Sequence, residues 1–216
     1  DILAGYYAKQ MGLPVGRLIC ASNKNNVLTD FLRTGTYDAR RTFYKTTSPS
    51  MDILISSNLE RLLYHVSGSS EKVAAWMQQL AETGVYTVDA DTLAKIQESF
   101  AAGCADDAAG FTEIKARFAE DNYLCDTHTA VAFRVAKDLG TETPMAVLST
   151  ASPFKFPRDV LAALGEDAPA SDFAAMAALT AATDAPAPES LRVLDTLPVR
   201  FTAAIDPADI RAAALR

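Results

Sequence analysis

At 216 residues the chain is long enough to bury a core, as one large domain or two small ones. Its 49% hydrophobic and 22% charged residues are ordinary for a globular protein, and its formal net charge of −7 argues against nucleic-acid binding, which requires a cationic face. No apolar run approaches the ~20 residues of a membrane-spanning helix, so we expect no membrane association and a cytoplasmic protein.

The N-terminal part reads as alternating helices and strands. Apolar residues at helical spacing predict a helix over 1–11, the apolar run 16–22 ("GRLICAS") predicts a buried strand, and 26–35 predicts a second helix. This alternation is typical of an α/β protein with a mostly parallel sheet and flanking helices. The polar loop 46–53 ("TTSPSMDI") that follows is the kind of segment that carries functional residues.

Helical patterns then dominate as far as residue 122. The predicted elements are helices at 58–66, 71–83, 90–102 and 112–121, with one short strand at 85–89. The α/β pattern returns with a helix over 126–140, N-capped by Asp126, a buried strand at 144–150 and a helix near Pro157. In the tail we predict a weak helix at 172–182, a partly extended 191–201 and a helix from Pro207.

This change of pattern divides the chain into four parts. They are part of a large α/β domain at 1–57, a helical insertion at 58–122, a return to the α/β domain at 123–166 and a C-terminal tail with helices at 167–216. We expect the strands at 16–22 and 144–150 to lie in one sheet, with the helical insertion outside it.

Residues of obvious chemistry are few. The cysteines, Cys20, Cys104 and Cys125, are spaced irregularly, so we expect free, buried or half-buried thiols and no metal site. His65 falls in a helical pattern and reads as structural or surface, and the pair Asp106–Asp107 reads as solvated surface. The sequence lacks a Gly-x-Ser-x-Gly, a Walker loop and a His-Glu-x-x-His motif.

Three polar segments stand where an α/β sheet binds ligands, beyond strand ends and at helix N-termini. They are Asp1, "DTHT" at 126–129 and "LSTASP" at 148–153. Unpaired amides and the helix dipole make a helix N-terminus suited to a phosphate, although simple capping explains "DTHT" equally well.

Four segments, in order, resemble the C-terminal part of bacterial threonine synthases. They are "DILAGYYAKQMGLPVGRLICASNKNNVLTDFLRTG", "TTSPSMDILISSNLERLLY", "YLCDTHTAVAFRVAKDLG" and "AVLSTASPFKFPRDV". The resemblance implies the tryptophan synthase β-like fold and an enzyme that uses pyridoxal 5'-phosphate (PLP). It implies the conversion of O-phospho-L-homoserine and water to L-threonine and phosphate, in threonine biosynthesis.

The resemblance also implies site residues. Asp1 and Ile2 would contact the PLP phosphate and Thr150 the pyridine nitrogen, although Thr150 could instead bond backbone at its strand end. Contacts to the substrate would come from Asn23, Asn25, Ser48 and Ser50, each of which could alternatively cap a turn, and from His128, which matches the family's histidine at a helix start. The chain departs from the family at Ser152, where a histidine is frequent, so that side chain's role is open.

The family's Schiff-base lysine lies upstream, in a segment without a counterpart among the eight lysines of this sequence. We therefore expect the C-terminal half of the enzyme, without a catalytic residue of its own, inactive alone and without bound PLP. Its partners would be O-phospho-L-homoserine and the missing N-terminal half. The alternatives are another PLP lyase of the same fold, such as a threonine dehydratase, and a non-catalytic α/β interaction module; "SPSMDILISSNLERLLY" argues against the dehydratase.

Overall fold

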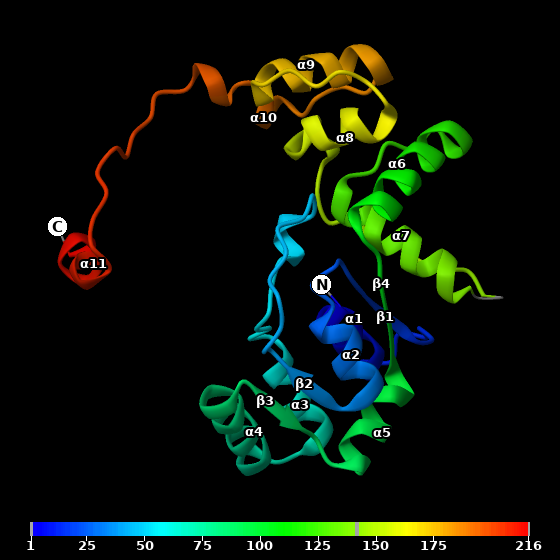
Figure 1. Cartoon of the computed structure of the whole chain (residues 1–216), viewed down its shortest axis with the longest axis vertical. Coiled ribbons are helices and arrows are strands. Elements are labelled where there is room, and N and C mark those ends of the chain that lie inside the picture. Colours follow the sequence, from blue (N-terminus) through cyan, green and yellow to red (C-terminus); the bar gives the residue numbers. More distant parts are fainter. Residues whose placement is uncertain (1, 141–142, 216) are drawn as a thin grey trace.

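The structure is a computed structural model that describes residues 2–140 and 143–215 (Figure 1). Its helices are α1 (Ile2–Gln10), α2 (Val27–Thr34), α3 (Leu59–Ser67), α4 (Ser70–Thr83), α5 (Ala90–Ser99), α6 (Asp107–Asp121), α7 (Thr127–Leu139), α8 (Pro157–Leu164), α9 (Asp172–Thr183), α10 (Glu189–Arg192) and α11 (Ile210–Ala214), with 3-10 turns at η1 (Pro49–Met51), η2 (Pro153–Lys155), η3 (Leu194–Thr196) and η4 (Pro207–Asp209). Its strands are β1 (Leu18–Ser22), β2 (Thr36–Asp38), β3 (Val85–Thr87) and β4 (Phe100–Cys104). In the part of the chain that is described, no helix has the length and apolar character needed to cross a membrane.

A short parallel sheet organises the middle of the molecule. β1 and β4 run parallel, with Leu18 opposite Phe100 and Ser22 opposite Cys104, and both α2 and α7 pack against the two strands. β2 and β3 form a separate antiparallel pair. This is an α/β fold with flanking helices, as the sequence predicts, and both strands of the parallel pair end at the same edge.

The partner of β1 differs from the prediction. Residues 144–150 form no strand and are almost all exposed, whereas Phe100–Cys104 follows α5 and pairs with β1, although the first three of these residues were predicted as the end of a helix. The sequence "FAAGC" is rich in small residues and lacks β-branched ones, so its own propensity does not announce a strand. Because β4 lies within 58–122, that region is not wholly outside the sheet; the four-part division of the chain itself stays a prediction.

Other boundaries follow local signals closely. Gly35 ends α2 with a left-handed φ of 76°, Asp126 caps α7, and the helices near Pro157 and over Asp172–Thr183 are present. β2 is an addition to the predicted elements, and α6 begins five residues earlier than predicted. Within 191–201, predicted to be partly extended, α10 ends at Arg192, Leu194–Thr196 form η3, and no residue is in a strand.

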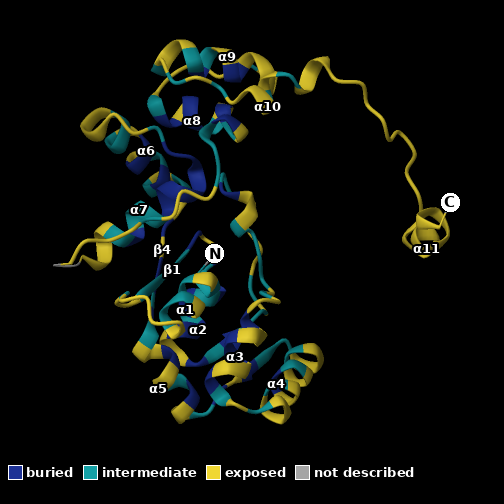
Figure 2. Ribbon diagram, turned by 180° about the vertical axis from the view of Figure 1, so that it is seen from behind, coloured by how far each residue is buried: buried dark blue, intermediate teal, exposed yellow. Residues whose placement is uncertain are grey.

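Two buried clusters stabilise the two ends of the molecule (Figure 2). One joins α2 to α5 with the antiparallel strands, around Phe31, Tyr37 and Leu63. The other joins α6 to α9 around Ile114 and Leu179. Phe100 and Ala102 of β4 belong to the first cluster and Ala130 of α7 to the second, so the junction of the parallel strands with α7 (Figure 1) is anchored in both.

Gly103 allows α7 to approach β4 closely. A Cβ atom at this position would lie 2.6 Å from Cγ1 of Val135, a side chain that is itself buried in α7. We expect Gly103→Ala to lower the free energy of unfolding by about 1–3 kcal/mol, as overpacking does, in urea denaturation. The control is Gly110→Ala, where a Cβ meets nothing within 4 Å and the loss of a helical glycine should stabilise by roughly 0.5–1 kcal/mol. Equal urea midpoints for Gly103→Ala and the unchanged protein would contradict this packing.

Candidate functional site

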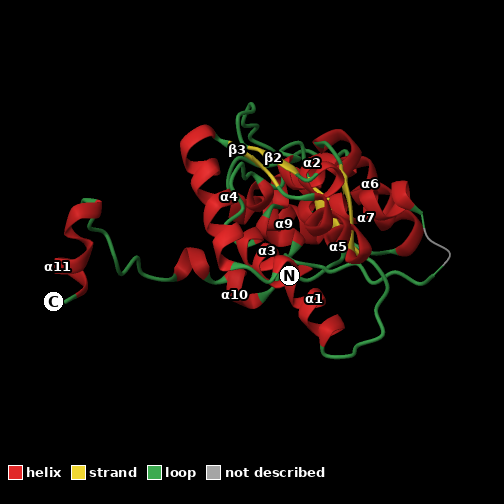
Figure 3. Ribbon diagram, turned by 90° about the horizontal axis from the view of Figure 1, so that it is seen from below, coloured by secondary structure: helices red, strands yellow, loops and turns green. Residues whose placement is uncertain are grey.

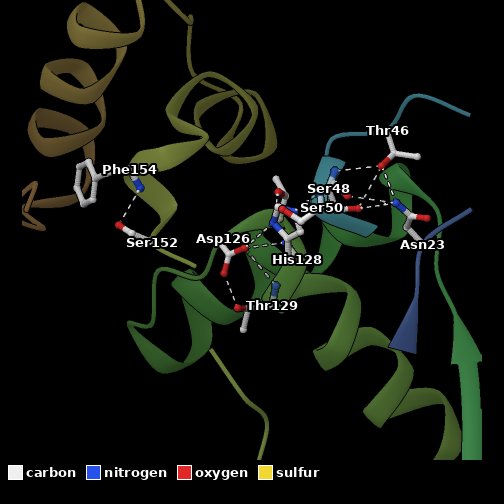
Figure 4. A network of polar contacts seen from close by, with 10 residues as sticks. Asn23, Thr46, Ser48, Ser50, Asp126, His128, Thr129, Ser152 and Phe154 are labelled. Atoms are coloured by element: carbon white, nitrogen blue, oxygen red, sulfur yellow. Dashed lines mark hydrogen bonds and ion pairs between the residues drawn. The ribbon is translucent and has the colours of Figure 1, made fainter. Parts of the chain in front are cut away.

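Polar segments converge on the edge where the parallel strands end. β1 leads into 23–26 and β4 into the start of α6, while the 46–52 segment and the N-terminus of α7 reach the same edge (Figure 4). Ligands of α/β proteins bind at this edge of the sheet. The predicted substrate-binding residues Asn23, Asn25, Ser48, Ser50 and His128 all belong to this group of segments.

Asn23 is the centre of the buried half of the site. Its side chain is 1% exposed, and its Nδ2 lies 2.8 Å from both Thr46 Oγ1 and Asp52 Oδ1 and 3.1 Å from Ser48 Oγ. Its Oδ1 accepts from the main-chain N–H of Asn25 at 2.9 Å. Because an amide nitrogen has two hydrogens, Asn23 has no donor left for a ligand.

The amide group of Asn25 also has both its nitrogen and its oxygen in hydrogen bonds. Its Nδ2 donates to the Tyr44 carbonyl at 2.9 Å and lies 3.0 Å from Asp52 Oδ1, while its Oδ1 accepts from the N–H of Tyr44 at 2.9 Å. The side chain thus continues the backbone pairing that a strand would provide for Tyr44. Asn23, Asn25 and the buried Ser48 hold the segment in place through these contacts.

Asp52 is a residue that the sequence reasoning did not select. Its carboxylate accepts from Thr46 N–H at 3.0 Å and Thr46 Oγ1 at 2.7 Å, in addition to the two asparagine amides. The available signal was an acid at the end of "SPSMD", seven residues before α3, in a loop already expected to be functional. A carboxylate surrounded by donors closes the loop into one hydrogen-bonded unit.

A second polar group lies at the N-terminus of α7. Asp126 is fully buried, accepts from the N–H groups of His128 and Thr129 and from the Thr129 hydroxyl, and lies 3.0 Å from Nδ1 of His128. Burial raises the pKa of this carboxyl, but the hydrogen bonds from His128 and Thr129 outweigh it, so its pKa lies below the usual value. Asp126 is therefore a charged cap that also orients the histidine ring.

Ser50 and Asp107 join the segment to these helices. The N–H of Ser50 donates to Nε2 of His128 at 3.1 Å, while Ser50 itself is exposed and its hydroxyl makes no hydrogen bond among the described residues. The N–H and hydroxyl of Thr47 donate to Asp107 Oδ1 at 3.2 and 3.0 Å. Asp107 is thus half-buried and engaged, unlike its exposed neighbour Asp106, which caps α6.

The residues predicted to contact the cofactor are Asp1, Ile2 and Thr150. Asp1 lies outside the described residues, and Thr150 is exposed in a segment without a strand, so its expected strand-end position is wrong. Ile2 lines an apolar pocket beside the first turn of α1. The other lining residues are Leu3, Cys20, Leu28, Leu32, Ser56, Asn58, Leu59, Leu62 and Phe100.

Ser152, His65 and the three cysteines are the other side chains that could carry chemistry. Ser152 accepts from the N–H of Phe154 at 3.3 Å and caps η2 (Figure 4), and His65 is an exposed residue whose Nε2 lies 2.8 Å from Tyr7 Oη. The three cysteines are free; Cys104 is exposed, contrary to expectation, and burial raises the pKa of Cys20 to about 11 and that of Cys125 to about 12. The two thiols of raised pKa are poor nucleophiles at neutral pH.

Comparisons with known proteins point to one family. The family model "Threonine synthase, C-terminal" matches residues 129–213. The threonine synthase-like 1 protein of Macaca fascicularis is 40% identical over 167 residues, which are 76% of this chain and 22% of that protein.

Solved structures extend the similarity to the fold. PLP-bound threonine synthase from Brucella melitensis matches with a TM-score of 0.74 and 41% identity, over 82% of this chain and 38% of that one. Threonine synthase from yeast matches with a TM-score of 0.81 and 33% identity, over all of this chain and 44% of that one. The sequence therefore spans less than half the length of each of these relatives. With segments, fold and relatives in agreement, the chain belongs to the threonine synthase family.

Proposed function

We propose that this chain forms the substrate-side part of a PLP-dependent enzyme that converts O-phospho-L-homoserine and water to L-threonine and phosphate. One observation carries the proposal. Three separate segments, 23–25, 46–52 and 126–129, meet in one hydrogen-bonded cluster at the carboxyl edge of the parallel strands. The same three segments belong to the blocks that resemble threonine synthases, in a chain whose relatives include a PLP-bound member of that family.

Within this proposal the residues have two different tasks. The exposed hydroxyl of Ser50 is the group that contacts substrate, because it is not engaged by the described residues. Asn23, Asn25 and Ser48 act indirectly, since their polar groups are already paired and buried. They keep the main chain of the 46–52 segment at the edge of the sheet.

The cofactor fits this chain only in part. PLP supplies an electron sink for the bonds broken and formed on an amino-acid substrate. The first-turn amides of α1 suit its phosphate. The pocket beside them is lined mainly by apolar side chains, its polar lining residues are Ser56 and Asn58, and it has no lysine among its lining residues. The lysines of the chain occupy other positions, namely Lys9, Lys24, Lys45, Lys72, Lys95, Lys115, Lys137 and Lys155. We therefore derive no covalent step from this chain.

This arrangement makes a direct prediction about labelling. When the 216-residue chain is incubated with PLP and then reduced with borohydride, we expect no single lysine to be labelled stoichiometrically, because none lines the pocket. Peptide mass spectrometry measures the label at each lysine. Full labelling of one lysine, together with protection of the bound cofactor from solvent, would contradict the placement of the lysines outside the site.

A chimera tests the proposed function itself. In the yeast threonine synthase, the part that matches this chain is replaced by residues 1–216, and phosphate and threonine release are measured with O-phospho-L-homoserine. We expect both products in equal amounts, and a large loss of turnover in the chimera that also carries Ser50→Ala. A chimera that folds, binds PLP and releases no phosphate would refute the function, and one that instead deaminates threonine would favour the dehydratase alternative.

A further inference from the structure

The 46–52 segment is fastened to α7 by one side chain. It belongs to the long connection between β2 and α3, and its turn η1 contains Ser50. The N–H of Ser50 donates to Nε2 of His128 at 3.1 Å, across 78 residues of sequence. The other attachment to a helix, from Thr47 to Asp107, reaches α6 instead.

The hydrogen bonds define the state of the His128 ring. Because Nε2 accepts the N–H of Ser50, it carries no hydrogen of its own. The ring proton therefore resides on Nδ1, from which it is donated to Oδ1 of Asp126 at 3.0 Å. The ring is 4% exposed and packs against Phe156, with centroids 4.7 Å apart, so it has little freedom to turn.

We propose that His128 is a positioning residue rather than a substrate ligand: it is neutral, has its tautomer set by Asp126, and holds the Ser50 main chain so that the Ser50 hydroxyl is presented to the ligand. Both ring nitrogens are used in this arrangement, so neither is available to a substrate. The identity of the ligand rests on the proposed function, whereas the fastening of Ser50 does not. Asp126 acts on Ser50 only indirectly, by orienting the His128 ring and fixing its tautomer.

Two substitutions distinguish the contact made by Nε2 of His128 from the contact made by its Nδ1. His128→Gln can place an amide oxygen near the position of Nε2, where it accepts from Ser50. His128→Asn places its amide near Nδ1, facing Asp126, and leaves the Ser50 N–H without an acceptor. His65→Asn is the matched control, because His65 is the other histidine of the chain and contacts α1 rather than this segment.

Hydrogen exchange at the Ser50 amide, followed by NMR in the full 216-residue chain, is the test. We expect His128→Asn to accelerate exchange at Ser50 by about tenfold, the order expected for one lost hydrogen bond. We expect His128→Gln to restore most of the protection, and His65→Asn to leave it unchanged. Unaltered exchange of amides in β1 confirms that each variant is folded.

The nitrogen-15 spectrum of the His128 ring gives a second readout that does not depend on any variant. We expect a protonated Nδ1 and an unprotonated Nε2. A proton on Nε2, or unchanged Ser50 exchange in a folded His128→Asn variant, would overturn the proposal. Neither measurement uses substrate or PLP, so a failed chimera assay with an intact Ser50 contact would refute the function and leave this arrangement standing.

Discussion

Asp126→Ala is expected to lower the free energy of unfolding by about 3–5 kcal/mol, the largest effect of any single substitution that we predict. The side chain is fully buried, and its removal leaves the Nδ1–H of His128 and the hydroxyl of Thr129 without their acceptor. Each buried donor left unpaired costs about 1–3 kcal/mol, and the lost N-cap of α7 adds about 0.5–2 kcal/mol. Urea denaturation followed by circular dichroism measures the loss.

The matched control is Asp106→Ala. Asp106 also caps a helix, but it is exposed and its side chain accepts only from Ala109 N–H in the described structure, at 2.9 Å. We expect a loss of about 1 kcal/mol there, the ordinary value for a cap. Equal losses for the two variants would mean that Asp126 is a simple cap and that its contact with His128 contributes nothing.

The effect of Asp126 also has a defined pH dependence. Its folded pKa lies below its usual value, so its charged form is favoured by folding. The stability it contributes is present above the unfolded pKa of about 3.9 and is lost as the pH falls through the lower folded pKa. We expect the difference between the unchanged protein and Asp126→Ala to be largest near neutral pH and to shrink below about pH 4. A difference that grows in acid would contradict the assigned direction.

The second large effect concerns association in solution. Residues 193–215, which we call the C-terminal arm, leave the body of the molecule after α10 and end in α11 (Figures 1 and 3). The arm exposes Val199 by 79%, Phe201 by 87% and Leu215 by 79%, together with other large apolar side chains. Burying one such side chain contributes about 1.5–3 kcal/mol, so covering several is comparable to the net stability of a domain.

We therefore expect the 216-residue chain alone to self-associate at micromolar concentration, because exposed apolar surface of this extent is unusual for a monomer. The triple variant Val199→Ser, Phe201→Ser and Leu215→Ser should shift the species in light scattering toward the monomer without a change in circular dichroism. Met11→Ser with Leu13→Ser is the control, since these exposed side chains lie outside the arm. A monodisperse monomer of the unchanged chain would contradict the expectation.

Much of the local structure could be predicted from the sequence because its signals are local. Helix caps such as Asp126 and stops such as Gly35 act within one turn, and the helix over 127–139 was predicted to within a residue. The order of family-like segments was equally visible, and it pointed to the fold that the relatives confirm.

The site was foreseen as a set of segments but not as a set of contacts. Asn23, Asn25 and Ser48 were predicted as substrate contacts from the resemblance to threonine synthases, yet only the structure shows that their donors are occupied. Asp52 was overlooked because its position at the end of "SPSMD" is a weak signal, and the four donor groups that its carboxylate accepts from come together only in the folded chain. Counting donors and acceptors requires coordinates.

The sequence by itself determined where most helices begin and end and to which family the chain is similar. Only the tertiary structure decided that Phe100–Cys104 is the strand that pairs with β1, that 144–150 is not, and that His128 holds Ser50. The physical reason is the range of the interactions. Helix caps depend on neighbours two to four residues away, whereas a strand of small residues and an oriented histidine depend on partners 82 and 78 residues distant, which no local pattern encodes.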